Sequence, residues 1–253
     1  MSAIRFALLG ALLAASSASA AGFASNDNFV VYTPDQNSQH DEQRYAELVL
    51  DRADTFRKEF AARWLGEELP DGAGESVIYV DFSATEDRGL TWAKDHPDRI
   101  FHNIYLTTSP ELATGCTLRH EIVHTVLATR YPHPHRLPEW VEEGIASRFD
   151  DESRRSAREQ LLRHWAQTGV VPDIAILLEL PDIKSLDESA YAAATSLVSF
   201  LLTKGDERTI LRFAEDGQRN GWAIALQAHY GIRTAHDLQA EWQTWLKHNF
   251  KST

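Results

Sequence analysis

The sequence predicts one α+β domain in which a small mixed sheet precedes a mainly helical second half. Short apolar runs of strand length all lie before residue 108, at 28–33, 76–82 and 100–107. From residue 117 onward, apolar residues recur instead at helical spacing. We therefore expect residues 21–253 to form a single domain, with the sheet and a central helix in 21–150 and further helices in 151–253.

Residues 1–20 have the pattern of a secretory signal peptide. Arg5 provides a positive charge, residues 6–15 form a short apolar run, and Ala18-Ser19-Ala20 is a small-residue cleavage site. The apolar run is too short to span a membrane as an anchor. The pattern predicts cleavage after Ala20 and export, which means a secreted or periplasmic protein with no membrane insertion once the signal is removed.

The composition excludes several classes of function. The 253 residues contain 25 Lys and Arg against 37 Asp and Glu, which gives a formal net charge of −12. Because an acidic chain gains nothing from neutralising phosphates, nucleic acid is not an expected partner. The single cysteine, Cys116, excludes an internal disulfide framework. The hydrophobic fraction of 43% is enough for a core that carries the fold by itself.

The N-terminal half is expected to contain three strands and one long helix. Strands are predicted at Asn28–Thr33, Ser76–Phe82 and Ile100–Thr107. Asp41–Trp64 has the spacing of an amphipathic helix. The predicted apolar face of this helix consists of Tyr45, Leu48, Val49, Ala53, Phe56, Phe60 and Trp64. Aromatic residues in such a row are far more often core than ligand sites.

The central feature is a His-Glu-x-x-His motif in a helix predicted over Thr117–Thr129. Because residues four apart lie on the same helix face, His120 and His124 can present both imidazoles to one metal ion. Glu121 lies about 100° round the helix from His120. That place suits a base acting on metal-bound water better than a third ligand. An apolar row roughly opposite the histidines predicts the face that packs on the core: Leu118, Ile122 and Val126.

A third ligand is expected from the next helix, predicted over Pro138–Phe149. Glu143 follows His124 after eighteen intervening residues and stands directly before a glycine. Glu142, one residue away, is the alternative ligand. The spacing and the following glycine favour Glu143.

Three other residues of ligand type lie near these motifs. Cys116 lies four residues before His120 and could be a fourth metal ligand or an inhibitory thiolate. We favour the alternative, a buried small hydrophobic residue at the start of the helix. His133 and His135 lie in a proline-rich loop, where we expect solvated side chains. A purely structural zinc site is disfavoured because such sites usually have four protein ligands.

The rest of the chain is expected to be largely helical. Pro172–Leu180 is an apolar stretch that either lines a pocket or packs in the core. Thr234 and Asp237 stand in capping-box positions. The weakest point between the two halves is predicted at Asp150-Asp151. Apolar periodicity indicates helices at Arg154–Gln167, Glu188–Leu202, Glu207–Ala214, Trp222–Tyr230 and Thr234–Phe250.

These motifs resemble those of the gluzincin metallopeptidases. The pattern is most similar to that of the zinc aminopeptidase branch. It consists of the His-Glu-x-x-His segment and, after eighteen residues, a Glu inside Trp-Val-Glu-Glu-Gly-Ile-Ala. The specific resemblance covers Thr117–Ala146, and the helical tail is similar to that of small secreted bacterial peptidase-like domains. The resemblance implies a zincin-like, thermolysin-type fold with one Zn²⁺ per chain. It implies His120, His124 and Glu143 as the zinc ligands and Glu121 as the general base.

The resemblance also implies a peptide or protein substrate. In this family the strand before the zinc helix edges the cleft and pairs with the substrate backbone, which points to Ile100–Thr107 here. Tyr191 is the candidate donor to the oxyanion, with a packed structural Tyr as the alternative. The Gly-x-Met-x-Asn exopeptidase motif of the aminopeptidases is missing, since the only methionine is Met1. Its absence favours an endopeptidase.

The sequence therefore predicts a zinc-dependent peptidase that hydrolyses peptide bonds by Glu121-assisted attack of zinc-bound water. The alternative is an exported, non-catalytic peptidase-like module that keeps the zinc site for binding or scaffolding. Because the base and all three ligand positions are present, the enzyme is favoured over the module.

Overall fold

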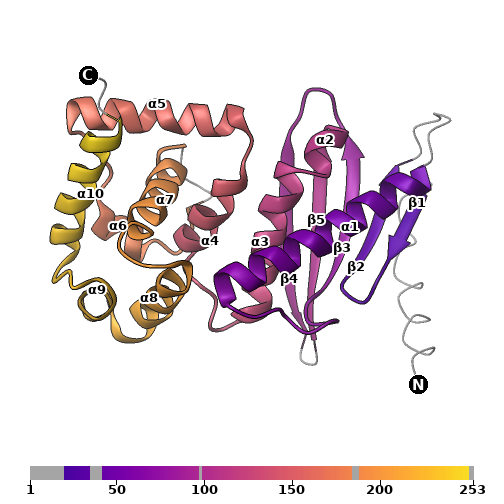
Figure 1. Cartoon of the computed structure of the whole chain (residues 1–253), viewed down its shortest axis with the longest axis horizontal. Coiled ribbons are helices and arrows are strands. Elements are labelled where there is room, and N and C mark those ends of the chain that lie inside the picture. The colour runs from indigo at the N-terminus through magenta and orange to yellow at the C-terminus, as the bar shows by residue number, and fades with distance from the viewer. Residues whose placement is uncertain (1–19, 35–41, 97–98, 184–187, 251–253) are drawn as a thin grey trace.

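The computed structural model describes residues 20–34, 42–96, 99–183 and 188–250. In this part of the chain, a five-stranded mixed sheet is followed by a mainly helical second half (Figure 1). The predicted α+β class is confirmed at this level. The predicted signal segment lies outside the described residues, apart from Ala20.

The sheet combines parallel and antiparallel pairs. Its strands follow the order β1-β2-β3-β5-β4, with β1 (Ala20–Ser25) and β4 (Arg88–His96) at the two edges. The inner strands β2 (Phe29–Pro34), β3 (Glu75–Phe82) and β5 (Arg99–Thr108) run parallel to one another. Both edge strands pair antiparallel with their neighbours. The three predicted strands are thus the three inner ones, whose apolar runs make them visible in the sequence.

The prediction that Ile100–Thr107 forms the edge of the cleft is wrong. This segment lies inside the sheet as β5, between β3 and β4, and β4 is the edge. The sequence does not reveal β4 because Arg-Gly-Leu-Thr-Trp-Ala-Lys-Asp-His contains no continuous apolar run. Charged residues are typical of an edge strand, where they oppose pairing with other chains. The other edge strand, β1, is short and rich in small residues and is missed for a similar reason.

One face of the sheet is covered by helices α1 and α3. α1 (Glu42–Phe60) continues into a π-helical turn at Ala61–Leu65 and packs on β1 and β2 (Figure 1). α3 (Cys116–Arg130) packs on α1, β4 and β5, and the short α2 (Pro110–Ala113) leads into it. Most of the predicted apolar face of α1 is buried, but Leu48 is 42% exposed, so its predicted place in the core is wrong.

The opposite face of the sheet carries a row of stacked and tilted aromatic rings. Their centroids are 5.5, 5.6 and 5.1 Å apart, and the residues are Phe23, Tyr32, Tyr79 and Tyr105. Cross-strand pairs of this kind stabilise the register of a sheet. The register continues to β4, where Leu90 lies opposite Tyr105. Because side chains alternate along a strand, Gly89 and Thr91 lie on the other face, toward α3.

The second half consists of helices α4 to α10. α8 extends to Asn220, beyond its expected end at Ala214. The hydroxyl of Thr234 accepts a hydrogen bond from the amide of Asp237 at 3.0 Å, which confirms the predicted cap of the last helix. The helices are α4 (Glu139–Ala146), followed by a 3₁₀ turn (Ser147–Phe149), α5 (Glu152–Thr168), α6 (Ile174–Glu179), α7 (Glu188–Leu201), α8 (Glu207–Asn220), α9 (Trp222–Tyr230) and α10 (Ala235–Phe250).

A continuous hydrophobic core joins the sheet half to the helical half. Trp140 of α4, Phe213 of α8 and Trp242 of α10 are among its largest fully buried side chains. α4 is therefore packed among the other helices of the second half and is not a surface helix. Within the part of the chain that the structure describes, no helix combines the length and the apolarity needed to cross a lipid bilayer.

Candidate metal centre

Helix α3 places its two motif histidines on one side and its apolar row on the other. Leu118, Ile122 and Val126 are at most 1% exposed and pack into the core, as the sequence predicts. The Nε2 atoms of His120 and His124 are 3.3 Å apart. The helical spacing therefore brings the two imidazoles to one point.

Helix α4 brings Glu143 to the same point. Its Oε2 lies 3.6 Å from Nε2 of His120, and its Oε1 lies 3.7 Å from Nε2 of His124. The approach of α4 depends on close packing, because a Cβ on Gly144 would lie 2.7 Å from the carbonyl oxygen of Ala194 in α7. The glycine that follows Glu143 thus lets α4 and α7 touch, which holds the carboxylate in place.

The three side chains fit a divalent metal ion with tetrahedral geometry. At Zn–N distances of about 2.0–2.1 Å, two ligand atoms of a tetrahedron are about 3.3–3.4 Å apart. The observed separations of 3.3, 3.6 and 3.7 Å are close to that value. Two imidazoles and one carboxylate are also a donor set that catalytic zinc sites use. The group His120, His124 and Glu143 could therefore hold a metal ion.

The alternative ligands lie elsewhere. The Oε2 atom of Glu142 is 3.7 Å from Nδ1 of His124, on the ring edge opposite the cluster. His133 and His135 are exposed, as expected for the loop. Cys116 is a partly exposed free thiol at the start of α3, so the expectation that it is buried is wrong. Among the described residues, the ligand cluster contains none of these four.

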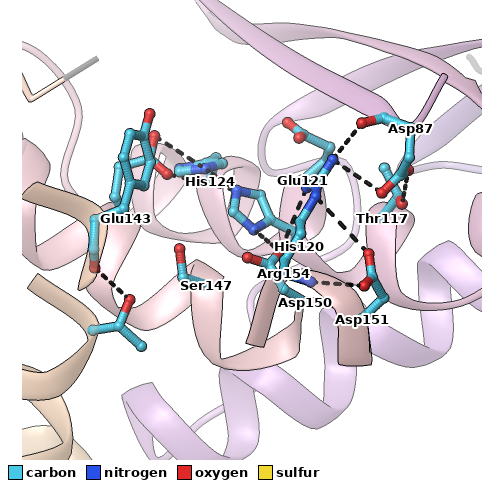
Figure 2. A network of polar contacts seen from close by, with 12 residues as sticks. Asp87, Thr117, His120, Glu121, His124, Glu143, Ser147, Asp150, Asp151 and Arg154 are labelled. Carbon is cyan, nitrogen blue, oxygen red and sulfur yellow. Dashed lines mark hydrogen bonds and ion pairs between the residues drawn. The ribbon is translucent and has the colours of Figure 1, made fainter. Parts of the chain in front are cut away.

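Asp150 orients the first histidine from the far side. Its Oδ1 lies 2.8 Å from Nδ1 of His120 (Figure 2), and its Oδ2 accepts a hydrogen bond from Arg158 at 2.6 Å. A proton held on Nδ1 leaves Nε2 of the imidazole free to bind a metal ion. Asp151 caps α5 by accepting from the amide of Arg154. Both residues at the predicted weak point Asp150-Asp151 thus make side-chain hydrogen bonds, and the weak point itself stays a prediction.

The acidic surroundings shift the pKa values of both histidines upward. Burial lowers the pKa of His120, but hydrogen bonds to Asp150 and Glu143 outweigh it and raise the pKa to about 10. Burial likewise lowers the pKa of His124, and the charge of Glu143 outweighs it. For Asp150, burial raises the pKa, but the hydrogen bond with His120 outweighs it and the pKa is lowered. The carboxylates thus favour a positive charge at this point, which either protons or a metal cation supply.

We expect Asp150→Asn to lower the affinity for zinc about ten- to a hundredfold. Asn keeps the size of the side chain but removes the charge that holds the proton on Nδ1 of His120. Zinc affinity is measured by competition with a chelator, on protein whose circular dichroism shows that it is folded. Asp151→Asn is the matched control, because Asp151 serves as the cap of α5. Equal affinities for the two variants would contradict the orienting role of Asp150.

A cavity of about 520 Å³ adjoins the cluster, lined by residues of β4, α3, α4, α5 and α7. Glu121 is 4% exposed and lines this cavity together with the three clustered side chains. Its Oε2 accepts a hydrogen bond of 2.6 Å from the hydroxyl of Thr91 on β4. The predicted base therefore shares a cavity with the ligands without belonging to the ligand cluster.

Tyr191, in the first turns of α7, lines the same cavity. Burial raises the pKa of its phenol, and the negative charge of Glu143 raises it further. The hydroxyl therefore keeps its proton at neutral pH and can donate a hydrogen bond. The structure thus brings this residue into the cavity, where the sequence predicted a donor.

The surroundings of the cluster include residues that no sequence motif marks. Asp150 follows the 3₁₀ turn that ends α4, in an extended conformation, and no helical spacing in the sequence marks it. Asp87 precedes β4 and pairs with Arg154 of α5 at 2.9 Å (Figure 2). Thr91 belongs to the edge strand that the sequence does not reveal. These contacts join segments far apart in the chain, so spacing cannot predict them.

The fold and the site together define an α+β protein with a buried His-His-Glu group that could hold a metal ion. No protein-family model and no curated protein sequence matches the chain.

Proposed function

We propose that this protein is a zinc-dependent peptidase of the gluzincin type with a zincin-like fold. The observation that carries the proposal is the convergence of His120, His124 and Glu143 at ligand-like distances, beside a cavity that Glu121 also lines. The three ligand atoms and the acid–base group come from two helices whose packing is fixed by the core. This combination supports hydrolysis over a purely structural metal site, which usually has four protein ligands.

The residues of the chain have distinct parts in the proposed reaction. Zinc, when bound by His120, His124 and Glu143, supplies Lewis acidity that polarises the scissile carbonyl and acidifies the attacking water. Glu121 takes the proton from that water and passes it to the leaving amine, as a general base and then a general acid. Its burial keeps competing bulk water away from the carboxylate.

Tyr191 is our proposed donor to the oxyanion of the tetrahedral intermediate. Its position in the cavity and its raised pKa support this role, because a protonated phenol can donate to a developing negative charge. Donors of this kind are worth about 10²–10³-fold in rate in other acyl-transfer enzymes.

The edge strand β4 is our proposed binding site for the substrate backbone. Among the described strands, β4 pairs only with β5, so its outer edge is available for an extended peptide. Residues 88–91 and Ala93 of β4 also line the cavity beside the cluster. The cavity-lining part of this edge continues from Arg88 to Ala93, and a site of that length supports an endopeptidase, which binds substrate residues on both sides of the cleaved bond. Export by an N-terminal signal stays part of the proposal, and removal of residues 1–20 would take only the first residue of β1.

The proposed function predicts chelator-sensitive cleavage of peptides. Purified wild-type protein should cleave members of a broad peptide library, lose this activity in a chelator, and regain it with added Zn²⁺. Cleavage positions are read by mass spectrometry, and internal cuts distinguish an endopeptidase from an exopeptidase. A zinc-loaded protein that cleaves nothing across the library would contradict the proposal and favour the non-catalytic module.

A further inference from the structure

The carboxylate of Glu121 is held between two residues of β4. Its Oε2 accepts a 2.6 Å hydrogen bond from the Thr91 hydroxyl. On the other side the strand comes so close that a Cβ on Gly89 would lie 2.1 Å from Oε1. The alternation of side chains along β4 directs both residues toward α3. The edge strand, and not α3 alone, therefore determines where the carboxylate lies.

The beginning of β4 is itself anchored to the metal-site helices. Asp87 accepts hydrogen bonds from the hydroxyls of Thr108 on β5 at 2.7 Å and Thr117 on α3 at 2.6 Å. It also pairs with Arg154 at 2.9 Å, and Arg154 lies 3.7 Å from Asp150 (Figure 2). The strand that contacts Glu121 is thus tied to the residue that orients His120. Its position relative to the metal site is fixed by the hydrogen bonds and the ion pair of Asp87, the residue directly before β4.

We propose that Thr91 is a positioning residue for Glu121 and that β4 aligns the base with the substrate. The inference rests on the proposed function, since it concerns how the same site works. The strand that offers its outer edge to the peptide also donates the hydrogen bond that fixes the base. The single strand β4 then fixes the positions of both the peptide backbone and the carboxylate of Glu121. A hydroxyl has one proton to donate, so it orients one oxygen of Glu121 and leaves the remaining lone pairs for the attacking water.

Thr91→Val removes the hydroxyl at nearly constant volume. We expect kcat to fall about ten- to a hundredfold, since a charged hydrogen bond is lost and the base is misplaced. KM and zinc affinity should change less than about twofold, because Val keeps the backbone edge and touches no ligand. Thr91→Ser keeps the hydroxyl and should restore most of kcat. Thr91→Ala is a second variant that removes the hydroxyl without adding bulk, so a steric clash cannot explain a lower kcat.

The matched control is Thr107→Val on the neighbouring strand. Thr107 is a partly buried strand residue that pairs with Arg88 of β4, and its replacement makes the same chemical change. Its kcat, KM and melting temperature should match those of the wild type. A lower kcat in both Val variants would assign the effect to the sheet in general and overturn the inference.

A double variant tests whether Thr91 acts through Glu121. In the Glu121→Gln background, Thr91→Val should leave the residual rate unchanged, because the side chain that Thr91 positions can no longer act as a base. Two losses that multiply would overturn the positioning role. Wild-type protein that cleaves no peptide would contradict the proposed function as a whole. A wild type that cleaves and a Thr91→Val variant with normal kcat would instead overturn this inference alone.

Discussion

Glu121→Gln is expected to keep zinc bound and to reduce peptide hydrolysis by at least about two orders of magnitude. General acid–base catalysis typically contributes 10²–10⁴-fold, and Gln cannot take a proton from water. The ligand atoms belong to His120, His124 and Glu143, so the change leaves the metal-binding group intact. Gln also keeps an oxygen that accepts the hydrogen bond from Thr91. The loss should therefore appear in kcat rather than in folding or metal content.

The measurement compares turnover and zinc content for the same preparations. Glu188→Gln is the matched control, because Glu188 lines the same cavity but is exposed at the start of α7. It should retain most of the activity. If Glu121→Gln cleaved peptides as fast as the wild type, the proposed chemistry would be excluded. If it lost its zinc, Glu121 would be a ligand and our assignment of roles would be wrong.

The second large effect is expected in metal binding. Glu143→Ala removes the only carboxylate of the cluster and should lower zinc affinity by much more than about a hundredfold. Glu142→Ala should lower zinc affinity by no more than about a hundredfold, because Glu142 contacts a ligand and not the metal itself. The geometry supports this order, because Glu142 faces Nδ1 of His124 at 3.7 Å while Glu143 faces both Nε2 atoms.

Zinc affinities of the two variants are compared by chelator competition at a fixed pH. The pH matters because protons compete with zinc for the histidines, and the pKa of metal-free His120 is raised to about 10. Zinc binding at neutral pH should therefore release protons, and affinity should rise as the pH rises toward that pKa. Equal affinities for Glu142→Ala and Glu143→Ala, or the reverse order, would show that the ligand assignment is wrong.

Local patterns in the sequence were sufficient to predict the centre of the site. A helix repeats every 3.6 residues, so two histidines four apart must share a face wherever that helix packs. The apolar row at Leu118, Ile122 and Val126 predicted the opposite, core-facing side in the same way. The third member, Glu143, came from resemblance and spacing, and the structure brings it to within 3.7 Å of both imidazoles. The inner strands were visible because buried parallel strands need continuous apolar runs.

The sequence by itself therefore determined the α+β class, the central helix, and the three side chains that could bind a metal. Only the tertiary structure decided which strand edges the cavity, that Thr91 holds Glu121, and that Asp150 orients His120. An edge strand such as β4 has one side open, so it needs no apolar run and leaves no pattern in the sequence. Its hydrogen bond to α3 joins residues thirty positions apart. Such contacts depend on how β4 and α3 pack, and no periodicity within a single segment carries that information.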